Sequence, residues 1–180
     1  MNTIESRPSA PVNIVLAGFM GTGKSTVGRL VARVLGWAFV DTDEVITERA
    51  GYSIVEIFAQ DGEAAFRQLE AVVCQELAQQ PKHVIATGGG ALINLDTRRA
   101  FEASGLVIGL RCDLDQIIQR VGHDPGRPLF SAERDRLVRL LDERADLYNS
   151  LPHQIDTTHA APEHITQEIV RLWQHTQSDT

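Results

Sequence analysis

The sequence predicts an α/β fold in which a parallel sheet is covered by helices on both faces. Short apolar runs of strand length alternate with longer segments whose apolar residues recur at steps of three and four. A glycine-rich loop, GFMGTGKST, joins the first run to the first such segment. Strands that alternate with helices favour a parallel sheet, and 180 residues suit a single domain over residues 1–180 with one substantial core.

The first elements follow directly from this alternation. Residues 12–17 (VNIVLA) form a short apolar run that predicts a buried strand, and residues 24–35 have the spacing of a helix. Residues 38–40 predict the second strand. A polar helix is expected over residues 42–50, because Gly51 supplies a stop signal.

The middle of the chain predicts two further helices before the third strand. Ser53 is suited to open a short helix. Residues 62–80 have apolar positions three and four apart, which indicates a long amphipathic helix, and Pro81 closes it. Residues 84–86 then predict a third buried strand.

The second half of the chain repeats the pattern. Asp96 is expected to cap a helix over residues 96–103, residues 106–110 predict the fourth strand, and Asp113 starts a helix toward residue 121. The last expected elements are a helix over residues 131–149, a strand over residues 154–156 and a terminal helix opened by Pro162.

The composition disfavours several classes of function. A net charge of −7 argues against non-specific binding to nucleic acid or to anionic membranes, because both require a basic surface. No apolar run approaches the ~18 residues of a membrane helix, and residues 1–11 are polar, so we expect a flexible tail and a cytoplasmic protein. Cys74 and Cys112 lie in apolar segments and are expected to be small core residues.

The strongest motif is a phosphate loop. Gly18 to Ser25 fits GxxxxGK[ST] between a predicted strand and a predicted helix. Glycines such as Gly21 and Gly23 let the backbone curl so that successive amide hydrogens point inward. Lys24 can then reach the outer phosphates, and the Ser25 hydroxyl can ligate Mg²⁺. A glycine-rich turn that matches by chance is the alternative, but every required position is present, so the motif predicts a nucleoside triphosphate with Mg²⁺ without specifying a kinase.

Two acids follow the second strand. Asp41 and Asp43 come where the carboxyl ends of parallel strands face a ligand crevice. One carboxylate can hold a water of a metal shell while the other orients an attacking hydroxyl or accepts its proton. Asp43 can also be no more than the cap of the next helix, since Asp is a favoured N-cap residue. Both interpretations stay open at this point.

A second cluster of candidates surrounds the end of the third strand. There a threonine and the glycines Gly88, Gly89 and Gly90 stand where such a chain often has an acid. Arg144 interrupts the apolar stripe of its predicted helix, Arg67 adjoins a core-facing phenylalanine, and a buried guanidinium must find an anion. Glycines offer close approach and free amides, and two guanidiniums match a carboxylate. These residues together predict a second anionic ligand.

Structural ion pairs are the alternative for both arginines. For Arg67 the candidate partners are Glu63, four residues before it, and Glu70, three residues after it. A further segment, residues 120–131, contains helix-breaking glycines and prolines and predicts a mobile lid. Its arginines, Arg120 and Arg127, are either solvated surface residues or, for a closing lid, contacts to the transferring phosphoryl group.

Taken together, these residues resemble the shikimate kinase family over nearly the whole chain, from Val12 to about Trp173. The matching motifs are GFMGTGKST, the DTD at 41–43, GEAAFRQLE at 62–70, TGGGAL at 87–92, the RP at 127–128 and ERADLY at 143–148. Most of them are modest alone, whereas their order and spacing are highly specific.

The resemblance implies a nucleoside-monophosphate-kinase-like P-loop fold. Such a fold has three layers, a five-stranded parallel sheet in the order 2-3-1-4-5, an acceptor-binding helical insertion (here residues 42–80) and a lid (residues 120–131). The implied reaction is transfer of the γ-phosphoryl group of ATP to the 3-hydroxyl of shikimate, a step toward chorismate and the aromatic amino acids. The implied partners are ATP and shikimate, the implied cofactor is Mg²⁺, and we expect a monomer.

The family's pattern also implies roles for individual residues. Asp43 would hold the ring hydroxyls and act as the base, and the substrate carboxylate would be bound by Arg67, Arg144, Gly88, Gly89 and Gly90. Ser25 would ligate Mg²⁺, with Asp41 in its water shell. The catalytic set would be Lys24, Asp43 and Arg127. The ATP-binding set would be Gly21, Thr22, Gly23, Lys24, Ser25, Thr26, Arg120, Arg127 and Pro162.

The chain departs from the resemblance in one loop and leaves two rival activities. Many members have an arginine near adenine where residues 156–162 here have only His159 and Ala160 before the proline. A gluconate kinase-like enzyme would share the phosphate loop and the fold, and a ligand-sensing module would bind shikimate-like acids without turnover. The triple glycine with its two arginines favours a cyclic hydroxy-carboxylate, and a lid arginine favours turnover.

Overall fold

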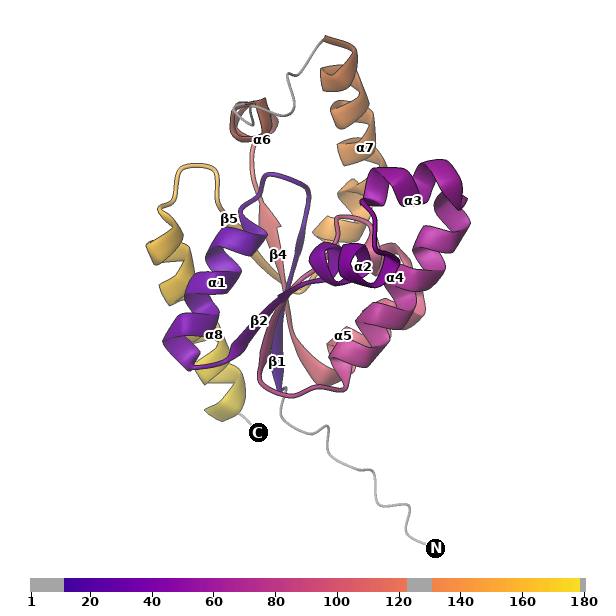
Figure 1. The fold of residues 1–180 in the computed structure, drawn as a ribbon. Coiled ribbons are helices and arrows are strands. Elements are labelled where there is room, and N and C mark those ends of the chain that lie inside the picture. Colours follow the sequence, from indigo (N-terminus) through magenta and orange to yellow (C-terminus); the bar gives the residue numbers. More distant parts are fainter. Residues whose placement is uncertain (1–11, 123–130, 179–180) are drawn as a thin grey trace, which may run out of the picture.

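The computed structural model describes residues 12–122 and 131–178, and a five-stranded parallel sheet forms its centre (Figure 1). The strands are β1 (Asn13–Gly18), β2 (Ala38–Asp41), β3 (His83–Ala86), β4 (Gly105–Arg111) and β5 (His153–Asp156). Their order is β2-β3-β1-β4-β5, and every neighbouring pair is parallel. The predicted fold class and strand order are confirmed.

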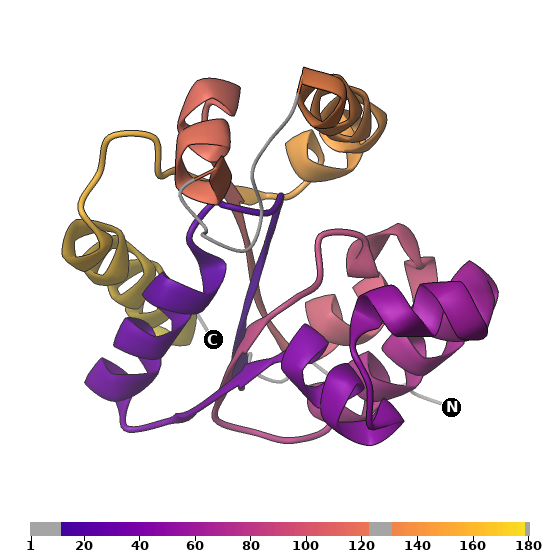
Figure 2. The ribbon, with the colours of Figure 1, turned by 45° about the horizontal axis from the view of Figure 1, so that its top comes forward.

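Helices cover both faces of the sheet. They are α1 (Lys24–Leu35), α2 (Thr42–Ala50), α3 (Ile54–Gln60), α4 (Gly62–Ala78), α5 (Leu95–Ser104), α6 (Leu114–Gly122), α7 (Ser131–Asn149) and α8 (Pro162–Ser178), with a short 3₁₀ turn η1 (Ala91–Ile93). Figure 2 shows α1 and α8 on one side of the strands and α2 to α5 on the other. Helices α6 and α7 lie near the carboxyl end of β4, at the top of Figure 1.

Alternate residues of β1 serve two different cores, as expected for a central strand that is buried on both faces. Ile14 and Leu16 pack with residues of α1 and α8. Val15 and Ala17 pack with residues of α4 and α5. A smaller third cluster joins the phosphate loop to α6 and α7, and its buried members are Phe19, Ile117, Leu137 and Tyr148.

The strand register brings the candidate loops together. Asp41 at the end of β2 pairs with Ala86 at the end of β3, and Ala86 also pairs with Leu16 of β1. The chain therefore leaves the three neighbouring strands at one edge of the sheet. The acid pair, the triple glycine and the phosphate loop lie at that edge.

The cap of α5 differs from the prediction. The helix begins at Leu95, and Asn94 rather than Asp96 is its N-cap. The Asn94 side chain accepts hydrogen bonds from the backbone N–H groups of Asp96 and Thr97, both at 3.0 Å. Asp96 lies instead in the first turn, where its negative charge interacts favourably with the helix dipole. The predicted cap was wrong because two residues, separated by Leu95, had suitable side chains and the helix begins after the earlier one.

Some predictions fall outside the described residues, namely the tail over residues 1–11 and most of the lid, including Arg127. None of the helices in residues 12–122 and 131–178 is long and apolar enough to cross a membrane. Cys74 is buried, Cys112 is half-buried, and both thiols are free. The prediction of a buried core position is therefore confirmed for Cys74, while Cys112 lies closer to the surface.

Candidate active site

The phosphate loop leaves β1 at Gly18 and enters α1 at Lys24. Gly21 and Gly23 have φ angles of 74° and 93°, in the left-handed region that favours glycine. The Lys24 ammonium donates hydrogen bonds to the backbone carbonyls of Gly18 (2.9 Å) and Phe19 (2.8 Å). The lysine is therefore held at the mouth of the loop, where it can exchange these carbonyls for phosphate oxygens.

The two acids after β2 have different roles. Asp41 is the N-cap of α2, because its carboxylate accepts a hydrogen bond from the backbone N–H of Asp43 at 3.1 Å. Its other oxygen accepts a hydrogen bond from the Ser25 hydroxyl at 2.6 Å. Asp43 is therefore not the cap of the helix, and its carboxylate lies in the site. This geometry resolves the alternative that the sequence left open.

Burial brings the pKa values of Lys24 and Asp43 closer together. Desolvation lowers the pKa of the Lys24 ammonium to about 8, although the carboxylates of Asp43 and Asp41 oppose that shift. Desolvation also raises the pKa of Asp43 to about 6, with further contributions from the negative charges of Asp41 and Glu70. Lys24 and Arg67 partly offset the rise. Both groups are mainly charged at neutral pH, yet each titrates nearer to neutrality than its counterpart in water.

The glycines after β3 make room for three predicted site residues. A Cβ on each glycine would crowd a different group: on Gly88 Asp43 Oδ1 (2.6 Å), on Gly89 Arg144 Nη1 (3.0 Å) and on Gly90 Arg67 Nη1 (2.8 Å). The turn is held by the Thr42 hydroxyl, which accepts a hydrogen bond from the Gly88 N–H at 2.8 Å. The structure therefore brings together the acid, both arginines and the bare backbone, as the sequence suggested.

The two arginines differ in their partners. Arg67 pairs with Glu70, whose side chain is 5% exposed, at 2.6 Å, and more loosely with Glu63 at 3.5 Å. The structural ion pair considered for Arg67 is thus present, and it orients the guanidinium beside the glycine turn. Within the described part of the chain, no carboxylate lies within ion-pairing distance of Arg144. Arg144 is therefore the guanidinium with more free capacity for an added anion.

One cavity of about 360 Å³ joins the phosphate loop to Asp43 and the glycine turn after β3. The loop lines one part of it with Gly21, Gly23, Lys24, Ser25 and Thr26. Asp43, Gly89 and Arg144 line the same cavity, as does Asp41. Arg67 is not part of its wall and approaches the turn beside Gly90. The cavity is large enough for a small polar molecule next to phosphate groups.

A neighbouring cavity of about 180 Å³ lies on the α8 side of the phosphate loop, lined among others by Thr22, Arg120 and Pro162. The Arg120 guanidinium donates hydrogen bonds to the backbone carbonyls of Thr157 (2.7 Å) and Gly21 (3.2 Å). It therefore ties the phosphate loop to the loop before α8. The predicted adenine-side residues that the structure describes meet at this position.

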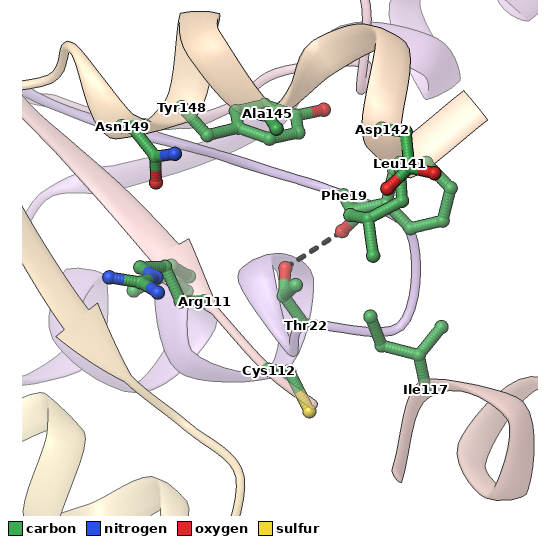
Figure 3. A pocket seen from close by; sticks show the side chains of 11 residues that line it. Phe19, Thr22, Arg111, Cys112, Ile117, Leu141, Asp142, Ala145, Tyr148 and Asn149 are labelled. Carbon is green, nitrogen blue, oxygen red and sulfur yellow. Dashed lines mark hydrogen bonds between the residues drawn. The ribbon is translucent and has the colours of Figure 1, made fainter. Parts of the chain in front are cut away.

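A third cavity, of about 250 Å³, lies behind the phosphate loop between α6 and α7 (Figure 3). Figure 3 shows Ala145, Tyr148 and Asn149 along one wall and Cys112 and Ile117 opposite them. Neither Lys24 nor either acid of the site lines this cavity. Its walls support the loop and α7 and contain none of the predicted site residues except Thr22.

Sequence reasoning missed two side chains of the site. Glu70 was considered only as an ion-pair partner, yet its charge also raises the pKa of Asp43. Tyr148 lies in the apolar stripe that Arg144 interrupts, yet its hydroxyl donates a hydrogen bond to the Gly89 carbonyl at 2.5 Å. The available signal for Tyr148 was its position four residues after Arg144, on the same face of α7.

The fold and the site define the class of protein: a P-loop enzyme whose phosphate-binding loop opens into a cavity lined by a carboxylate and a guanidinium. The shikimate kinase family matches residues 20–174. A shikimate kinase of Geobacter sulfurreducens is 43% identical over 166 residues, which is 91% of this chain and 92% of the relative. The chain belongs to the shikimate kinase family, so the predictions of an ATP-dependent kinase and of shikimate kinase activity are confirmed.

Solved structures agree with this assignment. The shikimate kinase from Acinetobacter baumannii in complex with shikimate has a TM-score of 0.83 and 37% identity, covering 92% of this chain and 93% of that one. A gluconokinase from Sinorhizobium meliloti has a TM-score of 0.63 at 17% identity, covering 95% of this chain and 98% of that one. The second likeness extends to the fold alone, so the gluconate alternative has no support beyond the shared architecture.

Proposed function

We propose that the chain transfers the γ-phosphoryl group of ATP to the 3-hydroxyl of shikimate, giving shikimate 3-phosphate and ADP on the route to chorismate. The observation that carries the proposal is the single cavity lined by Lys24, Asp43 and Arg144. These three groups match the chemistry of a phosphate donor, a hydroxyl acceptor and a carboxylate on the acceptor. A P-loop protein that did not bind a hydroxyl-bearing acid would not need Asp43 and Arg144 in the same cavity as Lys24.

The acceptor carboxylate is held by Arg144 and Arg67 together with the turn Gly88 to Gly90. A guanidinium presents parallel N–H donors that fit a carboxylate in a bidentate manner. The arrangement supports this role because Arg144 adjoins Gly89 and Arg67 adjoins Gly90. With its carboxylate held on that side, a ring acid places its hydroxyls toward Asp43.

Asp43 is the proposed base. Its pKa of about 6 leaves most molecules deprotonated at pH 7 while making the carboxylate more basic than an ordinary aspartate. It accepts the proton of the attacking hydroxyl as the new oxygen–phosphorus bond forms. The γ-phosphoryl group leaves the β-phosphate oxygen of ATP, and ADP is released.

The phosphates are bound by the amides of Gly21, Thr22 and Gly23, by Lys24 and by the start of α1 at Ser25 and Thr26. Amides at a helix N-terminus and a lysine provide positive charge where negative charge is held. Arg120 and Pro162 flank the adenine in the neighbouring cavity. Arg127, which lies outside the described residues, is proposed to reach the transferring group from the lid.

Ser25 and Asp41 are the proposed magnesium site. Their oxygens are joined by the 2.6 Å hydrogen bond described above, and hydroxyl and carboxylate oxygens are the donors that Mg²⁺ prefers. Mg²⁺ usually takes few protein ligands and keeps several waters, so this pair fits, with Ser25 as a direct ligand and Asp41 acting through water. When bound, the ion would neutralise charge on the phosphates.

We also propose which segments of the single domain bind the acceptor and form the lid, and that the protein is a cytoplasmic monomer. Residues 42–80, which contain α2, α3 and α4, form the acceptor-binding insertion, since they contribute both Asp43 and Arg67. Residues 120–131 form the lid. A monomer contains the complete cavity, so no second copy is required, and free thiols suit a cytoplasmic enzyme.

An ADP-release assay coupled to a pyruvate kinase and lactate dehydrogenase system tests the function. With shikimate as acceptor we expect saturable turnover, and with gluconate only the background rate. Calorimetric titration with shikimate, with and without a non-hydrolysable ATP analogue, measures binding separately. Binding of shikimate without turnover would identify the sensing module considered above, and turnover with gluconate would overturn the acceptor assignment.

A further inference from the structure

The hydroxyl of Tyr148 connects two parts of the acceptor site that are far apart in the chain. It donates a hydrogen bond to the Gly89 carbonyl at 2.5 Å, and Tyr148 itself is only 8% exposed. Arg144 lies one helical turn earlier on α7, and its guanidinium and the Tyr148 hydroxyl both lie beside Gly89, where the guanidinium acts on that hydroxyl. A phenol can donate one hydrogen bond and accept others, so one oxygen meets both groups.

The carbonyl that Tyr148 contacts controls the direction of a neighbouring amide. The C=O of Gly89 and the N–H of Gly90 belong to one planar trans peptide and point in opposite directions. The carbonyls of Gly88 and Gly90 accept hydrogen bonds within the turn, from Ala91 and Ile93 at 3.1 Å each. Among the described residues, a side chain of α7 holds the central carbonyl of the three and neither of the other two. Its orientation therefore depends on Tyr148.

Packing alone does not hold the phenol ring. One side of the ring joins the cluster of Phe19, Ile117 and Leu137. Tyr148 also borders the 250 Å³ cavity behind the phosphate loop, where Figure 3 shows it on the wall with Ala145 and Asn149. Because part of its surroundings is a cavity, the ring needs its hydroxyl contacts to keep a single position.

We propose that Tyr148 is a positioning residue of the acceptor site, whose hydroxyl sets the distance between the Arg144 guanidinium and the Gly89–Gly90 peptide so that both meet one carboxylate. The inference rests on the proposed function, because it assumes that the carboxylate of shikimate binds there. It adds a residue whose side chain need not touch the substrate. Tyr148 acts on the substrate through Arg144 and the Gly89–Gly90 peptide, which contact the carboxylate.

The test removes the hydroxyl and keeps the ring. For Tyr148→Phe we expect KM for shikimate to rise about tenfold, kcat to change less than about threefold and KM for ATP to stay within about twofold. Ser150→Ala is the matched control, because it removes a nearby hydroxyl that donates to the Leu147 carbonyl at 2.7 Å, away from the acceptor cavity. The control should leave all three parameters unchanged.

A neutral acceptor separates positioning from a general structural effect. The methyl ester of shikimate lacks the carboxylate charge, so the wild-type protein should strongly prefer the acid. In Tyr148→Phe this preference, measured as the ratio of kcat/KM values, should fall about tenfold, because the ester makes little use of the aligned donors. An equal loss for acid and ester, or no loss for either, would overturn the inference.

A second variant covers the possibility of a folding defect. Tyr148→Leu removes the ring as well and should lower the melting temperature, whereas Tyr148→Phe should restore the melting temperature without restoring KM for shikimate. If Tyr148→Phe restored both the melting temperature and KM for shikimate, only the packing of the ring would matter. If the wild-type protein turns over shikimate and Tyr148→Phe has the same kinetic constants, this inference alone is overturned. If the wild-type protein does not turn over shikimate, the proposed function is overturned.

Discussion

The phosphate loop and the turn from Gly88 to Gly90 are both glycine-rich strand ends, but they need glycine for different reasons. Gly21 and Gly23 have positive φ angles of 74° and 93°. The glycines after β3 are absent from the positive-φ residues of the described chain, and Gly90 has a φ of −112° that any residue can adopt. A Cβ at Gly90 would instead lie 2.8 Å from Arg67. Conformation is the reason for glycine at Gly23, and clearance is the reason at Gly90.

The difference extends to how each region is assembled. The phosphate loop binds through a contiguous stretch of backbone, so its function is contained in one short motif. The proposed acceptor site at the glycine turn is complete only when α4 and α7 bring Arg67 and Arg144 against it. Substitutions in the two regions should therefore affect different kinetic constants, with Asp43 between them affecting the chemical step.

The largest effect should come from Asp43→Asn, at the point where both regions meet. Loss of a general base typically costs about 10²–10⁴ in rate, so we expect kcat to fall by about 10³-fold or more with modest changes in both KM values. Steady-state kinetics measures this. The wild-type carboxylate is half-buried, and its folded pKa of about 6 exceeds the ordinary value. Its charge therefore destabilises the fold as pH rises through 6, so the variant should have the higher melting temperature at pH 8. Near-normal kcat would remove Asp43 from the mechanism.

Lys24→Ala should disable the phosphate region while leaving the acceptor region intact. Removing one donor that stabilises transition-state charge costs about 10²–10³ in kcat. Calorimetric affinity for shikimate should stay within about threefold. The melting temperature should not fall, because desolvation of the half-buried lysine disfavours its charge. Turnover close to that of the wild type would contradict the role of the loop.

Arg144→Leu should weaken the binding of shikimate and leave the binding of ATP intact, which is the reverse of the effect expected for Lys24→Ala. Truncating one partner of a buried charged interaction costs about 2–5 kcal/mol, so shikimate affinity should fall about 10²-fold and saturation should be lost. ATP affinity should be preserved. Arg139→Leu is the matched control, because Arg139 is exposed on the same helix. A variant that loses only thermal stability would indicate a structural arginine.

A pair of alanine substitutions tests the two uses of glycine directly. Gly90→Ala fits its backbone but displaces the Arg67 guanidinium, so KM for shikimate should rise about tenfold with ATP kinetics unchanged. In Gly23→Ala the added Cβ would have no neighbour closer than 4.0 Å. The substitution instead imposes about 1–2 kcal/mol of backbone strain at φ 93°, so it should weaken ATP binding. If both variants affected the same substrate, the distinction would be wrong.

The smallest predicted effect is the pH dependence near neutrality. Asp43 must be deprotonated to accept a proton and Lys24 protonated to stabilise phosphate, so kcat/KM should be highest between their pKa values of about 6 and about 8. At either pH the rate should be about half of its maximum. In Asp43→Asn the acidic limb should disappear while the basic limb remains. A flat profile from pH 5 to pH 9 would contradict both assignments.

The most local features were the most predictable. The phosphate loop, α1 and α2 were predicted at their observed bounds, because capping, turn and periodicity signals act over a few residues. The prediction failed where two neighbours competed for one position, as with Asn94 and Asp96 at the start of α5. The order of the strands followed from resemblance to a family and not from any single segment.

Contacts between segments that are distant in the sequence could not be predicted without the folded structure. Nothing in the sequence distinguishes Asp41 as the cap from Asp43 as the free carboxylate, because the choice depends on the Ser25 hydroxyl approaching from α1. The contact of Tyr148 with Gly89 joins residues 59 positions apart. Arg120 is similar, since its partners at Gly21 and Thr157 lie on two separate loops.

The amino-acid order alone was enough to specify the phosphate-binding loop, the alternation of strands and helices, and the candidate residues for binding an acid. The packing of the sheet and its helices decided which of those residues share a cavity and which carboxylate remains free. Packing also decided how far burial shifts the pKa values of Lys24 and Asp43. The reason is physical: hydrogen bonds within a turn depend on adjacent residues, whereas desolvation and the meeting of charges depend on everything that the fold brings near.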